Sequence, residues 1–273
     1  MSPSLVPVGN ERGWIVPVGG AEEKISDPAI LQRFVDISGE SNARIAIIPT
    51  ASQLEDTGPL YEEIFKDLGA GFAQALPYVE RGDADRDDWH NVLETASGIF
   101  FTGGNQLRIS TILGGTRVAQ TIRRQNANGI TVGGTSAGAA ILPEHMIAYG
   151  TTGETPQAGM VSLAPGLGLT NRFVIDQHFR ERDRLGRLLT ALSYNPFAVG
   201  LGIDENTAAF ISPDNVIHVE GAGAVTIVDV ADVEHSSVAS ADEGESLCIT
   251  NIKLHVLPQN ATFDLTTREA KPA

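Results

Sequence analysis

The chain has little cysteine, which limits its capacity to form disulfide bonds. Cys248 is the one cysteine in 273 residues, so an internal disulfide is excluded, and this fits a reducing compartment such as the cytoplasm. Cys248 lies in a strand-like stretch, Ser246-Leu247-Cys248-Ile249, which predicts a buried, inert thiol. The His, Cys and acidic residues show no recognisable zinc-ligand spacing. The sequence therefore predicts no metal.

Long apolar runs and an excess of basic residues are also missing. No apolar stretch is long enough to cross a membrane, and residues 1–5 lack the basic start and apolar run of a secretory signal. The chain has 19 Lys and Arg against 34 Asp and Glu, a net charge of −15, which argues against a nucleic-acid partner. We expect a cytoplasmic protein that contacts neither membranes nor nucleic acids.

A dinucleotide or phosphate loop is absent as well. Gly19-Gly20 follows an apolar run, but neither the G-x-G-x-x-G pattern nor the lysine of a P-loop accompanies it. The sequence thus predicts no nucleotide and, together with the missing metal spacing, no cofactor.

The pattern that is present is an alternation of short apolar runs with longer amphipathic ones. This is typical of β-α-β units on a mostly parallel sheet. From residue 208 onward, shorter runs separated by turns predict antiparallel strands added at a sheet edge. No linker or repeat divides the chain, so we expect a single domain over 1–273 with a loose tail at 267–273. The expected strands are 14–18, 44–48, 75–79, 98–102, 129–132, 173–175 and 198–203, and the expected helices include 116–128 and 182–192.

Residues 134–138 are the most informative stretch. Gly134-Thr135-Ser136-Ala137-Gly138 fits the G-x-S-x-G nucleophile elbow, with an apolar run before it and small residues after it. Such an elbow is a strained strand-to-helix turn that presents the serine hydroxyl, and the free N–H groups of the new helix can stabilise an oxyanion. The same letters also occur in ordinary tight turns, so the interpretation requires a base and an orienting acid elsewhere.

Two other predicted strands end in polar residues that could supply those groups. His178 follows the strand at 173–175 and is our candidate base, while Glu205 follows the strand at 198–203 and is our candidate orienting acid. His145 is the alternative candidate for the base, and Asp204 is the alternative candidate for the orienting acid. Because neighbours on a strand point to opposite faces, only one of Asp204 and Glu205 can face the site. The order Ser, His, acid differs from that of α/β-hydrolases, which favours another α/β fold.

Five arginines gather in one part of this acidic chain. They allow two interpretations: a solvated helix face with Glu181 and Asp183 as partners, or a set of guanidinium groups that bind carboxylates. The five are Arg172, Arg180, Arg182, Arg184 and Arg187.

Several segments together resemble the cyanophycinase family, in the expected order between about residues 14 and 230. The resemblance implies a serine exopeptidase with a class I glutamine amidotransferase-like fold, a three-layer α/β/α sandwich around a mostly parallel sheet. It also implies a homodimer and a substrate, cyanophycin, which is a poly-aspartate backbone with arginine joined by an amide to each side chain. The product would be the β-Asp-Arg dipeptide. The segments are 18–24, 101–108, 134–140, 174–179 and 200–205.

The resemblance also implies roles for individual residues. Ser136 would be the nucleophile, His178 the base and Glu205 the orienting acid, with Gly104 and Ala137 as the oxyanion hole. Asn105 stands where the family pattern has aspartate, and Glu154 is a candidate partner for the substrate guanidinium. The implied lining of the substrate pocket is Gln106, Asp176, Gln177, Arg182, Arg184 and Arg187.

Two other functions stay open. One is an aspartyl or isoaspartyl dipeptidase of the same family, and the other is a catalytically inactive binding protein on the same scaffold. An amidotransferase role is disfavoured, because those enzymes carry cysteine at the elbow where this chain has Ser136.

Overall fold

The computed structural model describes residues 3–273, and its largest element is a nine-stranded sheet. The strand order is β17-β16-β11-β10-β1-β5-β4-β2-β3. The five strands from β1 to β3 in that order pair in parallel, whereas β10, β11, β16 and β17 are antiparallel additions beside β1. The bounds are β1 Ile15–Val18, β2 Arg44–Ile48, β3 Phe72–Ala75, β4 Gly98–Phe101, β5 Thr131–Thr135, β10 Thr207–Ile211, β11 Val216–Gly221, β16 Thr262–Asp264 and β17 Glu269–Lys271.

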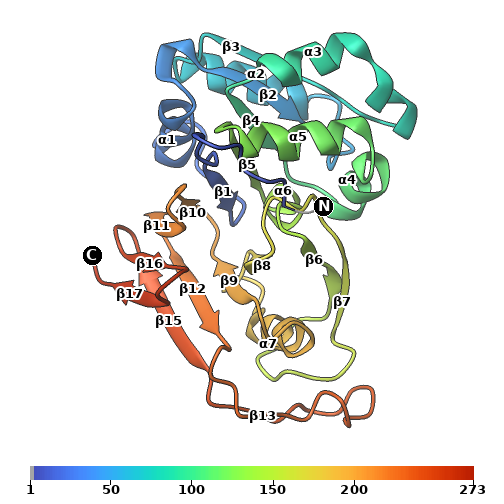
Figure 1. Cartoon of the computed structure of the whole chain (residues 1–273), viewed down its shortest axis with the longest axis vertical. Helices are drawn as coiled ribbons and strands as arrows, with labels where there is room; N and C mark the ends of the chain where they lie inside the picture. Colours follow the sequence, from blue (N-terminus) through green and yellow to red (C-terminus); the bar gives the residue numbers. More distant parts are fainter. Residues whose placement is uncertain (1–2) are drawn as a thin grey trace.

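Helices cover both faces of this sheet (Figure 1). Side chains alternate along each strand, so Ile45 and Ile47 of β2 pack with α1 and α2, while Ala46 and Ile48 pack in the core under α3, α4 and α5. The predicted three-layer sandwich with a mainly parallel sheet and antiparallel C-terminal strands is confirmed. The bounds are α1 Ala29–Ile37, α2 Thr57–Asp67, α3 Asp87–Thr95, α4 Gln106–Leu113, α5 Arg117–Ala127 and α6 Ala137–Ala140, with short 3₁₀ helices at Glu40–Asn42 and Arg81–Asp85.

A second, four-stranded sheet in the order β15-β12-β9-β8 lies beside the large one (Figure 1). We expected β8 and β9 as strands, and they pair in parallel, but they stand outside the main sheet. Helix α7 packs on them through Leu188 and Leu192. The bounds are β8 Phe173–Gln177, α7 Leu185–Tyr194, β9 Val199–Ile203, β12 Ala224–Asp229 and β15 Lys253–Pro258; two hairpin pairs complete the fold, β6 His145–Gly150 with β7 Val161–Pro165 and β13 His235–Ser236 with β14 Ile249–Thr250.

Two expectations about the C-terminal part are wrong. The tail at 267–273 is not loose throughout, because β17 pairs with β16 through Phe263 and Ala270. Cys248 is exposed and not buried, whereas its neighbour Ile249 in β14 packs against the core. None of the helices within residues 3–273 combines the length and apolar character that a membrane span requires.

Candidate active site

Ser136 occupies the turn between β5 and α6. Its backbone has φ 54° and ψ −112°, a region that residues other than glycine rarely adopt. Its N–H donates to Val18 O at 3.0 Å, which fixes the elbow on the neighbouring strand. A Cβ on Gly138 would lie 2.2 Å from Phe101 O, so only glycine lets the new helix sit this close to the sheet. The local structure is a strained elbow.

His178 and Glu205 reach Ser136 from the second sheet. Ser136 Oγ lies 2.8 Å from His178 Nε2, and His178 Nδ1 lies 2.6 Å from Glu205 Oε1. An imidazole with its proton on Nδ1 satisfies both contacts, since it accepts from the serine and donates to the glutamate. The structure therefore brings the three predicted residues into one hydrogen-bonded chain.

The two competing residues lie elsewhere. The ring of His145 packs against Phe197, with 6.0 Å between centroids. Asp204 is buried and accepts from the backbone N–H groups of Arg180 and Ala224. It thus secures the turns next to Glu205, and it has no hydrogen bond to His178 among those that the described residues form.

The surroundings of His178 favour its neutral form. Burial lowers the pKa of His178, and the positive charge of Arg182 lowers it too, while the hydrogen bond to Glu205 acts in the opposite direction. A neutral imidazole at neutral pH can take a proton from a serine hydroxyl, which is what a general base requires.

The loop that follows β1 links the two sheets at this point. Gly19 O accepts from His178 N and Gly20 O accepts from Asn206 N, both at 2.8 Å. Gly20 has φ 104°, and a Cβ there would lie 2.3 Å from Cε1 of the His178 ring. The imidazole thus packs directly against a glycine, a role for Gly19-Gly20 that the sequence pattern does not predict.

Glu22 fixes that loop to the large sheet, and it was also missed. Its buried carboxylate accepts from Thr135 Oγ1 at 2.5 Å and from the hydroxyl of Tyr61, and it pairs with Lys24 Nζ at 3.1 Å. Thr135 immediately precedes Ser136. The available signal was an acid that follows a strand and a glycine pair. A carboxylate buried at such a place must have several hydrogen-bond or ion-pair partners.

Gly104 and Ala137 flank the serine, as an oxyanion hole would require. Ala137 begins α6, so its N–H has no acceptor within the helix. Gly104 has φ 141°, and a Cβ there would lie 2.1 Å from Ala51 O, so only glycine fits. Asn105 then caps α4 by accepting from Leu107 N at 2.9 Å. Asn and Asp cap helices equally well, which explains how the departure from the family pattern is accommodated.

An arginine-lined cavity of about 460 Å³ opens beside Ser136. Five of the six predicted pocket residues border it, and Gln106 is held there by donating to Ile147 O and Ala148 O at 3.1 and 2.8 Å. The lining residues are Gly104, Gln106, Ser136, Ala148, Tyr149, Gly150, Gln177, Arg182, Arg184 and Arg187.

Asp176 is the exception, and its predicted place in the lining is wrong. Adjacent residues on β8 face opposite sides, so Gln177 borders the cavity while Asp176 is completely buried. It accepts from Arg187 Nε at 2.6 Å and Nη2 at 2.5 Å, and from Arg184 Nη1 at 3.4 Å. Burial raises the pKa of Asp176, and the two guanidinium groups oppose that rise. Its role is to hold two arginines at the cavity wall.

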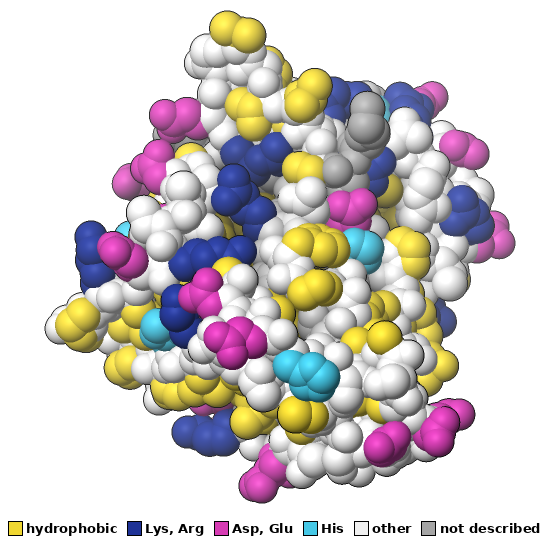
Figure 2. Space-filling view, turned by 60° about the horizontal axis from the view of Figure 1, so that its bottom comes forward, with side chains coloured by type: hydrophobic (Ala, Val, Ile, Leu, Met, Phe, Trp, Pro, Cys, Tyr) yellow, Lys and Arg dark blue, Asp and Glu magenta, His cyan; other side chains and the backbone are white. Residues whose placement is uncertain are grey.

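Some of the arginines are placed to bind carboxylates in the cavity, and others form a solvated face. Arg182, Arg184 and Arg187 border the cavity, whereas Arg180 is largely exposed and pairs with Glu181 at 3.0 Å. Glu154 is exposed and is not part of the cavity wall. On the face drawn in Figure 2, Lys and Arg side chains gather in a band, while most Asp and Glu side chains lie toward its margins. Basic groups are thus concentrated although the net charge is −15.

Comparison with known proteins identifies the family. The model of peptidase family S51 matches residues 16–219. The chain is 40% identical over 262 residues to a cyanophycinase from Synechococcus elongatus, covering 95% of this chain and 81% of that protein. It is 40% identical over 264 residues to a cyanophycinase from Geminocystis herdmanii, covering 94% of this chain and 96% of that protein.

A solved structure shares the fold. The crystal structure of a peptidase from an acI-B1 Actinobacterium superposes with a TM-score of 0.66 at 21% identity, covering 90% of this chain and 98% of that one. Together with the family match and the 40% identical relatives, the conclusion is that this chain belongs to peptidase family S51.

Proposed function

We propose that the protein is a serine exopeptidase that hydrolyses cyanophycin to β-Asp-Arg dipeptides. The observation that carries this proposal is the hydrogen-bonded chain Ser136–His178–Glu205 beside a cavity walled by three arginines. The curated relatives support the substrate, since they are cyanophycinases at 40% identity over nearly the whole chain.

In this mechanism Ser136 Oγ attacks the backbone carbonyl of the aspartate chain while His178 Nε2 takes the hydroxyl proton. Glu205 orients the ring and stabilises the imidazolium that forms. The N–H groups of Gly104 and Ala137 donate to the negatively charged oxygen of the tetrahedral intermediate. The imidazolium then protonates the leaving amine, and water, activated by the same ring, releases the acyl group from the serine.

The arginines recognise the carboxylates of the substrate. Each repeat of cyanophycin carries the α-carboxylate of its arginine, and guanidinium forks bind carboxylates through paired hydrogen bonds. Arg184 lines the cavity, and its Nε is buried and has no hydrogen-bond partner within residues 3–273. Burial lowers the pKa of Arg184 to about 10, which still leaves it charged at neutral pH. Gln106 and Gln177 supply further polar contacts.

The test is to incubate the purified protein with cyanophycin granules and to follow soluble β-Asp-Arg by mass spectrometry. Ser136→Ala removes the nucleophile, and we expect kcat to fall by a factor on the order of 10⁶. Release of the dipeptide by the wild type and not by the variant would establish both substrate and nucleophile.

The other outcomes separate the alternatives. Cleavage of β-aspartyl dipeptides without cleavage of the polymer would replace the proposal with a dipeptidase. Binding of the polymer with no hydrolysis, and no labelling of Ser136 by an activated serine reagent, would replace it with a binding protein.

Two further expectations stay predictions. A homodimer would be tested by sedimentation equilibrium of the purified chain, and a cytoplasmic location by fractionation of the cells that produce it.

A further inference from the structure

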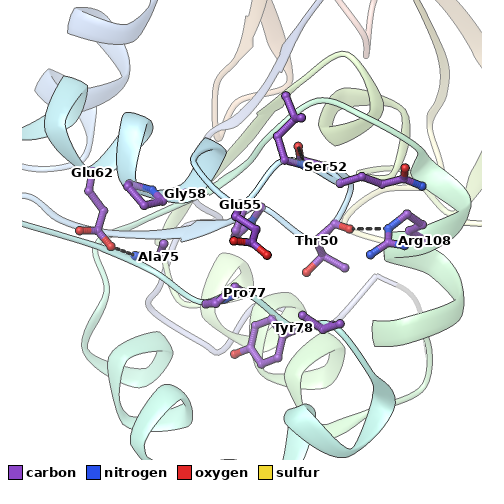
Figure 3. A pocket seen from close by; sticks show the side chains of 14 residues that line it. Thr50, Ser52, Glu55, Gly58, Glu62, Ala75, Pro77, Tyr78 and Arg108 are labelled. Atoms are coloured by element: carbon purple, nitrogen blue, oxygen red, sulfur yellow. Dashed lines mark hydrogen bonds between the residues drawn. The ribbon is translucent and has the colours of Figure 1, made fainter.

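A second cavity, of about 540 Å³, lies at the carboxyl ends of β2 and β3. It is separate from the arginine-lined cavity, with which it shares none of its lining residues. Figure 3 shows the Glu55 carboxylate and Thr50 on one side of it and Pro77 with Tyr78 on the other. Its size falls in the range of small-molecule sites, and no step of the proposed mechanism uses it.

Two buried hydroxyl groups in the wall of this cavity lack partners. Thr50 is 3% exposed and Tyr78 is 1% exposed, and neither Thr50 Oγ1 nor the Tyr78 hydroxyl has a hydrogen-bond partner in the part of the chain that the structure describes. Buried polar groups are almost always hydrogen-bonded. The charged groups that act on the Tyr78 hydroxyl are Asp88, Arg86 and Asp83, and none of them lines the cavity. A bound ligand with donor groups would therefore give a partner to Thr50 Oγ1.

The charged groups of the cavity are of both signs. Glu55 is exposed to the cavity, and Arg108 reaches it from α4, where its Nε donates to Thr50 O at 3.1 Å. Glu62 is already engaged by Ala75 N at 2.7 Å. The available pair is therefore one carboxylate and the outer part of one guanidinium, on walls that include Pro49, Pro59 and Pro77.

We propose that this cavity binds an arginyl unit of the polymer at a distance from the bond being cleaved, so the inference rests on the proposed function. Glu55 receives the guanidinium, Arg108 receives the α-carboxylate, and the proline walls contact the methylene stem. Thr50 Oγ1 accepts a hydrogen bond from the guanidinium. Charge-assisted pairs of this kind are the strong contacts in such sites.

The position of the cavity suits a polymer. β2 is separated from β5, which ends directly before Ser136, by β4 alone, and neighbouring strands lie about 4.8 Å apart. The two sites are thus roughly 10 Å apart at strand level, a distance that about three extended residues span. Gly104 of the first site packs on Ala51 and Ser52, which begin the loop along the second. One chain of aspartates could therefore contact both.

The decisive measurement is hydrogen exchange of the full-length protein with free L-arginine as the probe. We expect protection in residues 49–62 and 77–79, and about tenfold weaker binding in Glu55→Gln. Agmatine, which lacks the carboxylate, should protect these segments less than L-arginine does, and this difference should disappear in Arg108→Gln. Glu63→Gln is the matched control, because Glu63 is an exposed acid on α2 outside the cavity wall.

Hydrolysis gives the second readout. Glu55→Gln should raise KM for the long polymer several-fold with kcat unchanged, and it should not alter hydrolysis of a two-repeat substrate. If Glu55→Gln behaves like Glu63→Gln in both assays, the inference is overturned while polymer hydrolysis stands. If L-arginine protects 49–62 in a Glu55-dependent way but the polymer is not cut, the arginine site stands and the proposed function fails.

Discussion

The two sheets contribute different kinds of chemistry to the site. The nine-stranded sheet supplies the proposed nucleophile and the proposed oxyanion-hole N–H groups, through the elbow at Ser136 and the glycine turn at Gly104. The four-stranded sheet supplies titratable and charged side chains: His178, Glu205 and the arginines held by Asp176. In the proposed mechanism, attack and proton transfer therefore depend on how well the two sheets are aligned. The loop from Gly19 to Glu22 contacts both, and it makes this alignment testable.

Among the variants that test the alignment of the two sheets, the largest effect is expected from a change in the four-stranded sheet alone. Glu205→Gln preserves shape but removes the charge that orients and stabilises the imidazolium, and we expect kcat to fall by about 10⁴-fold, as in other triads. The measurement is steady-state release of β-Asp-Arg. Asp214→Asn, at an exposed acid in the turn between β10 and β11, should be unaffected, and equal losses in both variants would contradict the assigned role.

The next effect tests the junction between the sheets. Gly20→Ala places a Cβ against the His178 ring and a side chain at φ 104°, so the imidazole must shift and kcat should fall by about 10²-fold. Gly69→Ala is the matched control, since Gly69 also has positive φ, 93°, but open space around it. It should lose about 1 kcal/mol of stability and keep full activity. Retained activity in Gly20→Ala would show that ring placement tolerates movement.

A smaller effect is expected from the anchor of the same loop. Glu22→Gln turns one accepting oxygen into a donor that faces the hydroxyl groups of Thr135 or Tyr61. We expect a loss of about 1–3 kcal/mol in the free energy of unfolding and a roughly tenfold lower kcat. Tyr61→Phe removes only the contact to α2, so it should lower stability without lowering kcat. Parallel losses in both variants would indicate a purely structural role for Glu22.

The smallest effect is a shift in pH dependence. Because the pKa of His178 is lowered from 6.5, the base is neutral at neutral pH, and kcat/KM should fall only as the pH drops below that value. Arg182→Gln removes a positive charge that lowers this pKa, so the acidic limb should move to higher pH. The measurement is kcat/KM between pH 4 and 8, a range that brackets the unperturbed value of histidine. If the acidic limb stays at the same pH in Arg182→Gln, it reports the titration of a group other than His178.

Local signals explain which parts of the fold were predictable. The apolar run Arg44–Ile48 coincides with β2, and the helix predicted at 116–128 is α5, Arg117–Ala127, because each is set by periodicity within one segment. The helix predicted at 182–192 starts later, at Leu185, since positive φ at His178 and Asp183 shapes a tight turn first. The separation of β8 and β9 into their own sheet depends on packing between distant segments, which periodicity does not encode.

In the candidate site, too, features set by local sequence were predictable and contacts between distant segments were not. The glycines around Ser136 mark the elbow because strained backbone restricts residue type. Asp176 was misplaced, although the alternation that decided between Asp204 and Glu205 also applies to Asp176 and Gln177. Glu22 and Tyr61 lie 39 positions apart, and no spacing rule connects them. Contacts of this kind arise only from the assembled structure.

The order of the elements along the chain has a consequence for synthesis. Ser136 and its parallel strands emerge from the ribosome first, and domains begin to fold while translation continues. The base and its acid follow at 178 and 205, and β9 is flanked by β12, which is in turn flanked by β15 at Lys253–Pro258. A growing chain therefore holds Ser136 without its hydrogen-bond partners for much of its synthesis, and the proposed site is complete only after the strands that follow Glu205 have been made.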